Sequence, residues 1–107
     1  MKRNEVWWVA FDPSVGGEIR KTRPAIIISN DTANLTLNRL QVVPISSQIS
    51  RVFTSEVLVM LNGQPRKALG DQVTTVSKLR LGSKMGELSG ADMAKVSQVV
   101  KFQLGLL

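Results

Sequence analysis

The sequence predicts a small, mainly β domain of barrel-like form, with one helix packed at its C-terminal end. Three observations support this fold class. Short segments rich in β-branched and aromatic residues recur along the chain and are separated by Gly, Pro, Asn and Asp. A convincing helical pattern occurs once, near the C-terminus. The chain has 107 residues, the size of one ordinary domain, so we expect residues 1–107 to form a single unit.

Three strands are predicted in the first half of the chain. Residues 5–11 are rich in aromatic and β-branched side chains and are followed by Asp12-Pro13. Residues 24–29 are apolar on both faces, which predicts a central strand. Residues 40–45 form the third strand, and Pro44 predicts that this strand ends, bulges or lies at an edge there, because proline has no amide hydrogen. The polar residues 32–38 have room for one helical turn.

The second half predicts further strands and the terminal helix. Residues 55–61 form a strand that ends at the hairpin signal Asn62-Gly63. Residues 68–76 form the next strand, and 79–81 and 85–88 are shorter pieces. Ser89 and Asp92 have capping-box spacing, and Gly105 is expected to end the helix. Its apolar stripe consists of Met93, Val96, Val99, Val100 and Leu104.

Composition excludes several kinds of protein. The chain carries 14 Lys and Arg against 8 Asp and Glu, a net charge of +6, and it contains neither Cys nor His. A disulfide framework, a zinc knuckle, a Ser-His-Asp triad and a two-histidine ribonuclease mechanism are therefore excluded. The positive charge favours an acidic partner such as nucleic acid. No apolar run approaches the length of a bilayer span, so we expect a soluble cytoplasmic protein.

The charged loop before the second strand is the first candidate site. Arginine offers two parallel donors to a phosphate, although a solvated hairpin loop would have the same composition. Arg23 is distinctive because it directly precedes Pro24, which forces an extended backbone at the mouth of a buried strand. The charged residues of this loop are Glu18, Arg20, Lys21 and Arg23.

Other candidates follow later strands. The side chains of Ser46, Ser47 and Gln48 either bind a phosphate or base edge or form an ordinary turn. Asp71 either caps a turn or holds a donor in place, and a basic group follows it at Lys78, Arg80 and Lys84. Trp7 and Trp8 must face opposite sides of a strand. One is expected in the core; the other covers a dimer interface or stacks on a base, and we favour the interface.

The order of these segments resembles the MazF/PemK toxins, also called mRNA interferases. The resemblance includes Glu5-Val-Trp7, Phe11-Asp-Pro-Ser14, Lys21-Thr-Arg-Pro24 and Val43-Pro-Ile-Ser-Ser-Gln48. It continues through Ala68-Leu-Gly-Asp-Gln-Val73 to the terminal helix, and so covers nearly the whole chain. It implies a homodimer with the SH3-like barrel of the MazF, Kid and CcdB toxins.

The resemblance also implies an activity. The family cleaves single-stranded RNA at short sequences without a metal or other cofactor, using the substrate 2′-hydroxyl as nucleophile. A cognate antitoxin inhibits it by laying an acidic tail across the RNA groove. Arg23 matches the family's working Arg. Ser46 replaces its working Thr, which keeps the hydroxyl but loses the β-branch. Glu18 matches a loop carboxylate and is the candidate proton acceptor, with Asp71 as the alternative.

RNA binding is assigned to the remaining polar candidates. Basic side chains would contact phosphates, and the side chains of Asn30, Ser47 and Gln48 would select bases that are splayed into pockets. The basic side chains are Arg20, Lys21, Lys78, Arg80 and Lys84. Two alternatives remain at this stage: a CcdB-like poison of DNA gyrase, disfavoured because the chain end lacks Trp, and a non-catalytic RNA-binding module.

Overall fold

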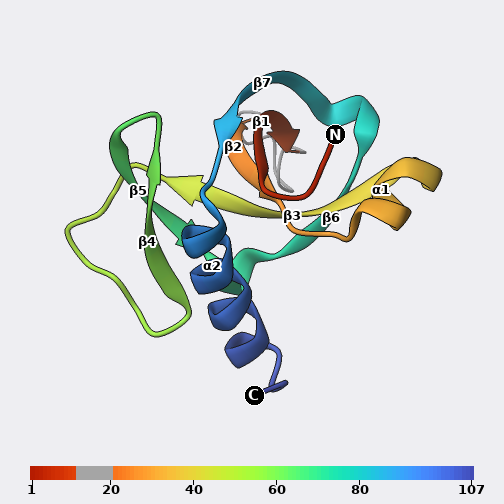
Figure 1. The fold of residues 1–107 in the computed structure, drawn as a ribbon. Coiled ribbons are helices and arrows are strands. Elements are labelled where there is room, and N and C mark those ends of the chain that lie inside the picture. Colours follow the sequence, from red (N-terminus) through yellow and green to blue (C-terminus); the bar gives the residue numbers. More distant parts are fainter. Residues whose placement is uncertain (12–20) are drawn as a thin grey trace, which may run out of the picture.

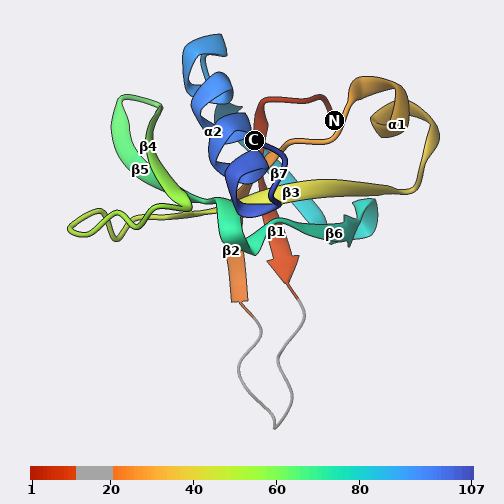
Figure 2. The same ribbon diagram turned by 90° about the horizontal axis from the view of Figure 1, so that it is seen from below.

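A computed structural model of the chain describes residues 1–11 and 21–107. These residues form one seven-stranded antiparallel sheet in the order β4-β5-β3-β2-β1-β7, with β6 also paired to β3. The helix α2 lies alongside the β4–β5 hairpin, and the short helix α1 lies at the other end of the sheet (Figures 1 and 2). The elements are β1 Glu5–Phe11, β2 Lys21–Ile27, α1 Asp31–Thr36, β3 Arg39–Ser46, β4 Glu56–Leu61, β5 Gln64–Leu69, η1 Gly70–Gln72, β6 Thr74–Ser77, η2 Lys78–Arg80, β7 Leu81–Glu87 and α2 Gly90–Gln103.

The predicted fold class, mainly β with a C-terminal helix, is confirmed. The bounds of β1 agree with the prediction, and β2 lies between β1 and β3 as expected for a strand buried on both faces. However, β2 begins three residues earlier than predicted. Its polar start is extended because it pairs with β1 as far as Phe11 and Lys21. Pairing between strands therefore overrides the local polarity of this segment.

Pro44 lies at a gap in the pairing of β3. The strand pairs with β6 as far as Val42 and with β5 from Ile45 onward. On its other side, β3 pairs with β2 through Pro44 and Ala25. The missing amide hydrogen is accommodated where one neighbour has ended and the next has not begun. The strand ends two residues later, at Ser46.

The prediction of one strand over residues 68–76 is wrong. The two-residue turn Asn62-Gly63, with φ of 52° and 77°, returns the chain at once, so β5 starts at Gln64. The strand stops at Gly70, where a Cβ would lie 2.6 Å from the carbonyl oxygen of Ser55. A 3₁₀ turn, η1, then redirects the chain so that β6 pairs with the far end of β3.

The two short pieces predicted at 79–81 and 85–88 are also corrected. Residues 78–80 form the 3₁₀ turn η2, and residues 81–87 form one continuous strand, β7. This strand pairs with β1 with two shifts in register, which allow it to follow the curvature of the sheet. Gly86 is closely approached, since a Cβ there would meet Asn62 Oδ1 at 2.8 Å.

The terminal helix α2 has the predicted ends. Ser89 Oγ accepts a hydrogen bond from the Asp92 amide, and Gly105, with φ of 72°, ends the helix in a Schellman motif. The Asp92 carboxylate does not complete a capping box. It accepts a hydrogen bond from the Met60 amide at 2.8 Å and so joins the helix to β4. Leu104, the last residue of the predicted stripe, is exposed.

Two hydrophobic clusters stabilise the sheet. The larger lies under α2 and includes Ile26, Val43 and Val96. The smaller lies on the other side and includes Val9, Ile27 and Leu40. Because both faces of β2 and β3 are buried, the ends of these strands are firmly fixed. In the described parts of the chain no helix is long and apolar enough to cross a membrane.

A buried carboxylate ties the N-terminus to β7. Glu5 accepts hydrogen bonds from the Lys2 amide at 2.9 Å and from Trp7 Nε1 at 3.0 Å, and its other oxygen lies 3.2 Å from Lys84 Nζ. Burial raises the pKa of Glu5, but these partners lower it more, to about 2. The ionised form is therefore the one that stabilises the fold.

This arrangement predicts a specific loss of stability in acid. The pKa of Glu5 is below its unfolded value, so its contribution is complete above about pH 5 and disappears as pH falls toward about 2. Glu5→Gln should lower the free energy of unfolding at neutral pH by about 2 kcal/mol and flatten its dependence between these values. Urea unfolding at several pH values measures this.

Glu87→Gln, which changes an exposed partner of the same lysine, should cost under about 0.5 kcal/mol. Equal pH dependence in wild type and Glu5→Gln would contradict the assignment.

Candidate active site

Neighbouring strands bring Arg23 and Ser46 to the same end of the sheet. Ala25 on β2 pairs with Pro44 on β3, and the two candidate residues each lie two positions beyond this pair. Side chains two positions apart on a strand share a face, so Arg23 and Ser46 belong to one face at one level. Both are partly buried. The sheet register therefore joins two residues that are 23 positions apart in the sequence.

Arg23 and Ser46 both line a pocket of about 470 Å³. Its lining combines guanidinium, hydroxyl and amide groups with an apolar wall, and among the described residues it includes no carboxylate. Such a lining is suited to a ligand that has both anionic and flat apolar parts, as a nucleotide has. The lining residues are Trp8, Arg23, Pro24, Ile45, Ser46, Ser47, Gln48, Arg66 and Met85.

The Ser46 hydroxyl is held by its own loop. Its Oγ accepts a hydrogen bond from the Gln48 amide at 3.1 Å. This bond restrains the serine side chain. It therefore compensates for the loss of the rotamer stiffness that the β-branch of a threonine would have supplied. Because Oγ is the acceptor in this contact, its own proton is free to be donated to a ligand oxygen.

The loop that carries Ser47 and Gln48 is anchored at its far end. Lys67 on β5 is buried and lies 3.2 Å from the Glu56 carboxylate, and its Nζ also donates to the carbonyl oxygen of Arg51. The Phe53 amide donates to Glu56 at 2.9 Å. The hydrogen bond from this amide lowers the pKa of Glu56. Partial burial opposes this effect, and Lys67 lowers the pKa further. The ionised pair thus fixes the path of residues 51–56 next to the pocket.

The two tryptophans lie on opposite sides of β1, as predicted. Trp7 is half-buried against the smaller cluster. Trp8 is 37% exposed and lines the pocket beside Arg23 and Pro24. This position leaves the exposed ring open to both predicted roles, the dimer interface that we favoured and stacking on a base.

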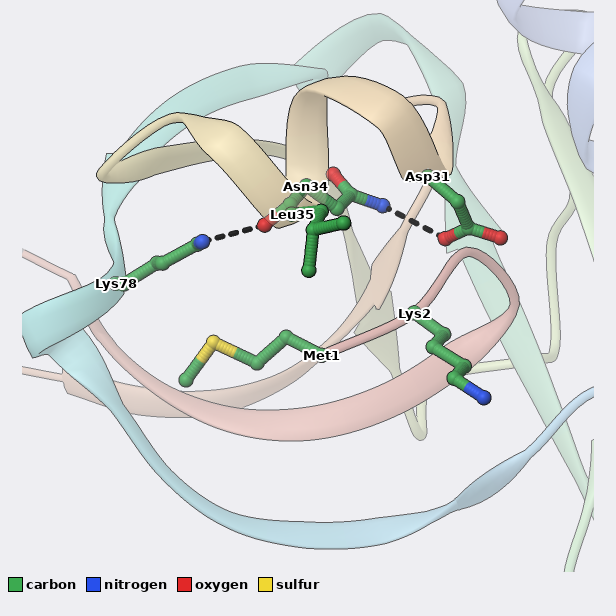
Figure 3. A pocket seen from close by; sticks show the side chains of 6 residues that line it. All are labelled: Met1, Lys2, Asp31, Asn34, Leu35 and Lys78. Atoms are coloured by element: carbon green, nitrogen blue, oxygen red, sulfur yellow. Dashed lines mark hydrogen bonds between the residues drawn. The ribbon is translucent and has the colours of Figure 1, made fainter.

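Lys78 and Asn30 lie away from this pocket. Lys78 lines a second pocket at the end of the sheet that carries α1, where its Nζ donates to the carbonyl oxygen of Asn34 (Figure 3). Asn30 is the N-cap of α1 and accepts a hydrogen bond from the Ala33 amide at 2.8 Å. The structure thus gives both residues structural contacts outside the pocket of Arg23.

The remaining candidates are also dispersed. Lys21 is exposed at the start of β2, and Asp71 is exposed in η1. Arg80 lies in η2, where its Nη1 donates to the carbonyl oxygen of Ala10 at 3.2 Å. Neither Asp71 nor Arg80 is among the residues that line the pocket. Glu18 and Arg20 lie outside the described residues.

Sequence reasoning missed Arg66 as a site residue. It lies on β5, just before the strand that was predicted over residues 68–76, yet it lines the pocket with Arg23. The signal was present in the hairpin. A two-residue turn at Asn62-Gly63 fixes the register and places Arg66 opposite Val59, a core residue. A charged residue opposite a core valine is unusual enough to mark as functional.

Across residues 1–11 and 21–107, no three carboxylate, thiol or imidazole side chains come together as metal ligands do. The pocket of Arg23 instead offers hydrogen-bond donors and positive charge.

Comparisons with known proteins identify the family. A model of the PemK-like, MazF-like toxins of type II toxin-antitoxin systems matches residues 2–104, so the chain belongs to this family. It is 35% identical to the endoribonuclease MazF9 of Mycobacterium tuberculosis, over 99% of this chain and 98% of that protein. It is 30% identical to the endoribonuclease EndoA of Bacillus subtilis, over 100% and 97% of the two chains.

Solved structures show the same fold. A MazE–MazF crystal structure from Deinococcus radiodurans superimposes with a TM-score of 0.83 at 22% identity, covering 100% of this chain and 97% of that chain. A mycobacterial endoribonuclease in complex with its cognate antitoxin gives 0.82 at 22% identity, with the same coverage. The expected toxin fold is therefore confirmed, although the described sheet is open: its end strands β4 and β7 are not paired with each other.

Proposed function

We propose that the protein is an endoribonuclease toxin that cleaves single-stranded RNA at a short sequence and is inhibited by a cognate antitoxin. The observation that carries this proposal is the pocket in which Arg23 and Ser46 meet. Full-length relatives named endoribonucleases, together with the family match, support it. A CcdB-like action on gyrase has no such support, because the comparisons point to MazF and PemK proteins.

The proposed reaction uses the substrate's own nucleophile. The 2′-oxygen attacks the adjacent phosphorus, the bond from phosphorus to the 5′-oxygen breaks, and the products are a 2′,3′-cyclic phosphate and a 5′-hydroxyl end. One proton must leave the 2′-hydroxyl and one must reach the 5′-oxygen. No metal or other cofactor takes part in this scheme, since positive charge for the phosphorane-like state comes from arginine.

Each site residue has a role in this scheme. Arg23 would clamp the scissile phosphate with two parallel donors. Ser46, whose Oγ is the acceptor in its bond with the Gln48 amide, would donate its proton to a phosphate oxygen or orient the attacking group. Glu18 remains our proposed proton acceptor, with Asp71 as the alternative. Trp8 would stack on a base while the loop side chains of Ser47 and Gln48 select it.

The partners follow from the same chemistry. We propose that the toxin is a homodimer that acts on mRNA in the cytoplasm. The net charge of +6 would attract both RNA and an acidic antitoxin tail to one groove. Basic residues outside the pocket, among them Lys21, Lys78 and Arg80, would contact more distant phosphates. Both complexes should weaken as salt concentration rises.

Cleavage of a long RNA by purified protein tests the proposal. We expect short fragments with 5′-hydroxyl ends, cut at one recurring sequence, and an unchanged rate in EDTA. End mapping of the fragments gives the cleavage sequence. A nuclease that depends on a divalent metal, assayed in parallel as a control, should lose its activity in EDTA. Shifted but intact RNA in a gel would instead indicate a non-catalytic binding module and would reject the enzyme assignment.

A further inference from the structure

Arg66 is a cation mounted on the core side of the sheet. It pairs with Val59 of β4, and Ala68 lies two positions further along β5. Both neighbours are almost completely buried in the cluster under α2. Paired residues and residues two apart share a face, so the Arg66 side chain starts on this apolar face and is itself half-buried. A guanidinium there is costly unless an anion meets it.

The Nε of Arg66 is buried and has no hydrogen-bond partner among the described residues. The adjacent buried cation is treated differently, because Lys67 has both the Glu56 carboxylate and the Arg51 carbonyl oxygen as partners. An unpaired buried donor is rare in folded proteins and calls for an explanation. An external acceptor that enters the pocket would satisfy it.

The pocket indicates what this acceptor is. Arg66 and Arg23 are both among the residues that line this cavity of about 470 Å³. The Nε and one terminal nitrogen of an arginine form two parallel donors that fit two oxygens of a phosphate. A base edge would accept these hydrogen bonds but would bring no negative charge to offset the second cation. Two adjacent phosphates of one RNA strand would satisfy both arginines.

We propose that Arg66 binds the RNA phosphate next to the scissile one, donating from Nε and a terminal nitrogen to two of its oxygens. This inference rests on the proposed RNA-cleaving function and adds a second phosphate contact to the same pocket. Arg23 holds the phosphate that reacts, and Arg66 fixes the neighbouring phosphate and so sets the path of the strand past Ser46. Its contribution falls mainly on substrate binding.

Affinity for an uncleavable RNA tests this inference. The probe is a short single strand containing the mapped cleavage sequence with a 2′-deoxy nucleotide at the cut. Arg66→Ala should weaken binding by about tenfold and reduce the slope of log affinity against log salt by about 0.7. Arg66→Lys should keep the wild-type slope without recovering full affinity, because lysine lacks the double donor. Fluorescence anisotropy across a salt series gives both quantities.

Arg39→Ala is the matched control. It removes one guanidinium from the opposite end of β3, where Arg39 pairs with Ser77, and should leave affinity for the probe near the wild-type value. Thermal unfolding confirms that each variant is folded, and Arg66→Lys serves if Arg66→Ala is not. Cleavage by each folded variant should keep the wild-type sequence preference.

The outcomes separate the two proposals. If wild type cleaves RNA but Arg66→Ala and Arg66→Lys bind the probe with unchanged affinity and salt slope, the role of Arg66 is rejected and the proposed function stands. A changed base preference in the Arg66 variants would show that this residue reads a base and would also reject it. If the wild-type protein neither cleaves nor binds RNA, both proposals fail together.

Discussion

Arg23→Ala is expected to lower the rate of RNA cleavage by about 10²- to 10³-fold. The reason is electrostatic, because the phosphorane-like state carries more negative charge than the bound RNA. A guanidinium fixed at the mouth of a buried strand stabilises that state without reorganising. Losing one such donor costs about 3–4 kcal/mol of transition-state stabilisation. Single-turnover cleavage of a short RNA with the mapped sequence measures the chemical step directly.

Two further variants make this result interpretable. Arg23→Lys keeps the charge but not the double donor and should recover only a small part of the rate. Arg39→Ala removes an exposed guanidinium from the far end of β3 and should cleave at nearly the wild-type rate. Arg23 lies on β2, which is paired on both sides with β1 and β3. The Arg23 variants should therefore unfold at temperatures close to that of the wild type. A folded Arg23→Ala protein with the wild-type cleavage rate would rule out the assigned role.

A single 2′-deoxy nucleotide on the 5′ side of the cut is expected to abolish cleavage at that site. The proposed mechanism has no other nucleophile, because the hydroxyl of this one ribose forms the new bond to phosphorus. Binding should be nearly unaffected, since one hydroxyl among many phosphate contacts contributes little to affinity. Gel analysis of an end-labelled RNA with one substituted position reads the result directly.

The matched control moves the same substitution by one nucleotide. A 2′-deoxy residue on the 3′ side of the cut leaves the nucleophile in place, so cleavage should continue at a comparable rate. Cleavage at the substituted site with a 3′-phosphate end would show that water is the nucleophile. The role of Ser46 and the search for a proton acceptor would then need to be reconsidered.

Local sequence signals predicted the elements that depend on neighbouring residues. The N-cap at Ser89, the glycine end at Gly105 and the hairpin at Asn62-Gly63 each involve a few consecutive positions. The structure confirms all three. The same local signals failed where long-range pairing decides, as in the split of residues 68–76 into β5, η1 and β6. There, the close approach of Gly70 to Ser55, distant in sequence, ends the strand.

The candidate site shows the same division. The Arg-Pro pair and the Ser-Ser-Gln run were recognisable as segments, but their meeting depends on the pairing of β2 with β3. Lys78 and Asn30 had suitable chemistry and yet lie around α1, far along the sheet (Figure 1). Side-chain type alone could not separate these positions from those in the pocket, because distance in space is set by strand order.

The sequence by itself determined the fold class, the ends of the terminal helix, the family and the absence of histidine and cysteine chemistry. These properties are carried by composition, by short-range periodicity and by ordered motifs. Only the tertiary structure decided that Trp8 and Arg66 join Arg23 and Ser46 in one pocket. It also revealed that Arg66 Nε has no hydrogen-bond partner in the part of the chain that the structure describes. The physical reason is that strand register and sheet curvature bring together side chains from four strands. Burial of these side chains makes an unpaired charge costly and so favours the binding of an opposite charge.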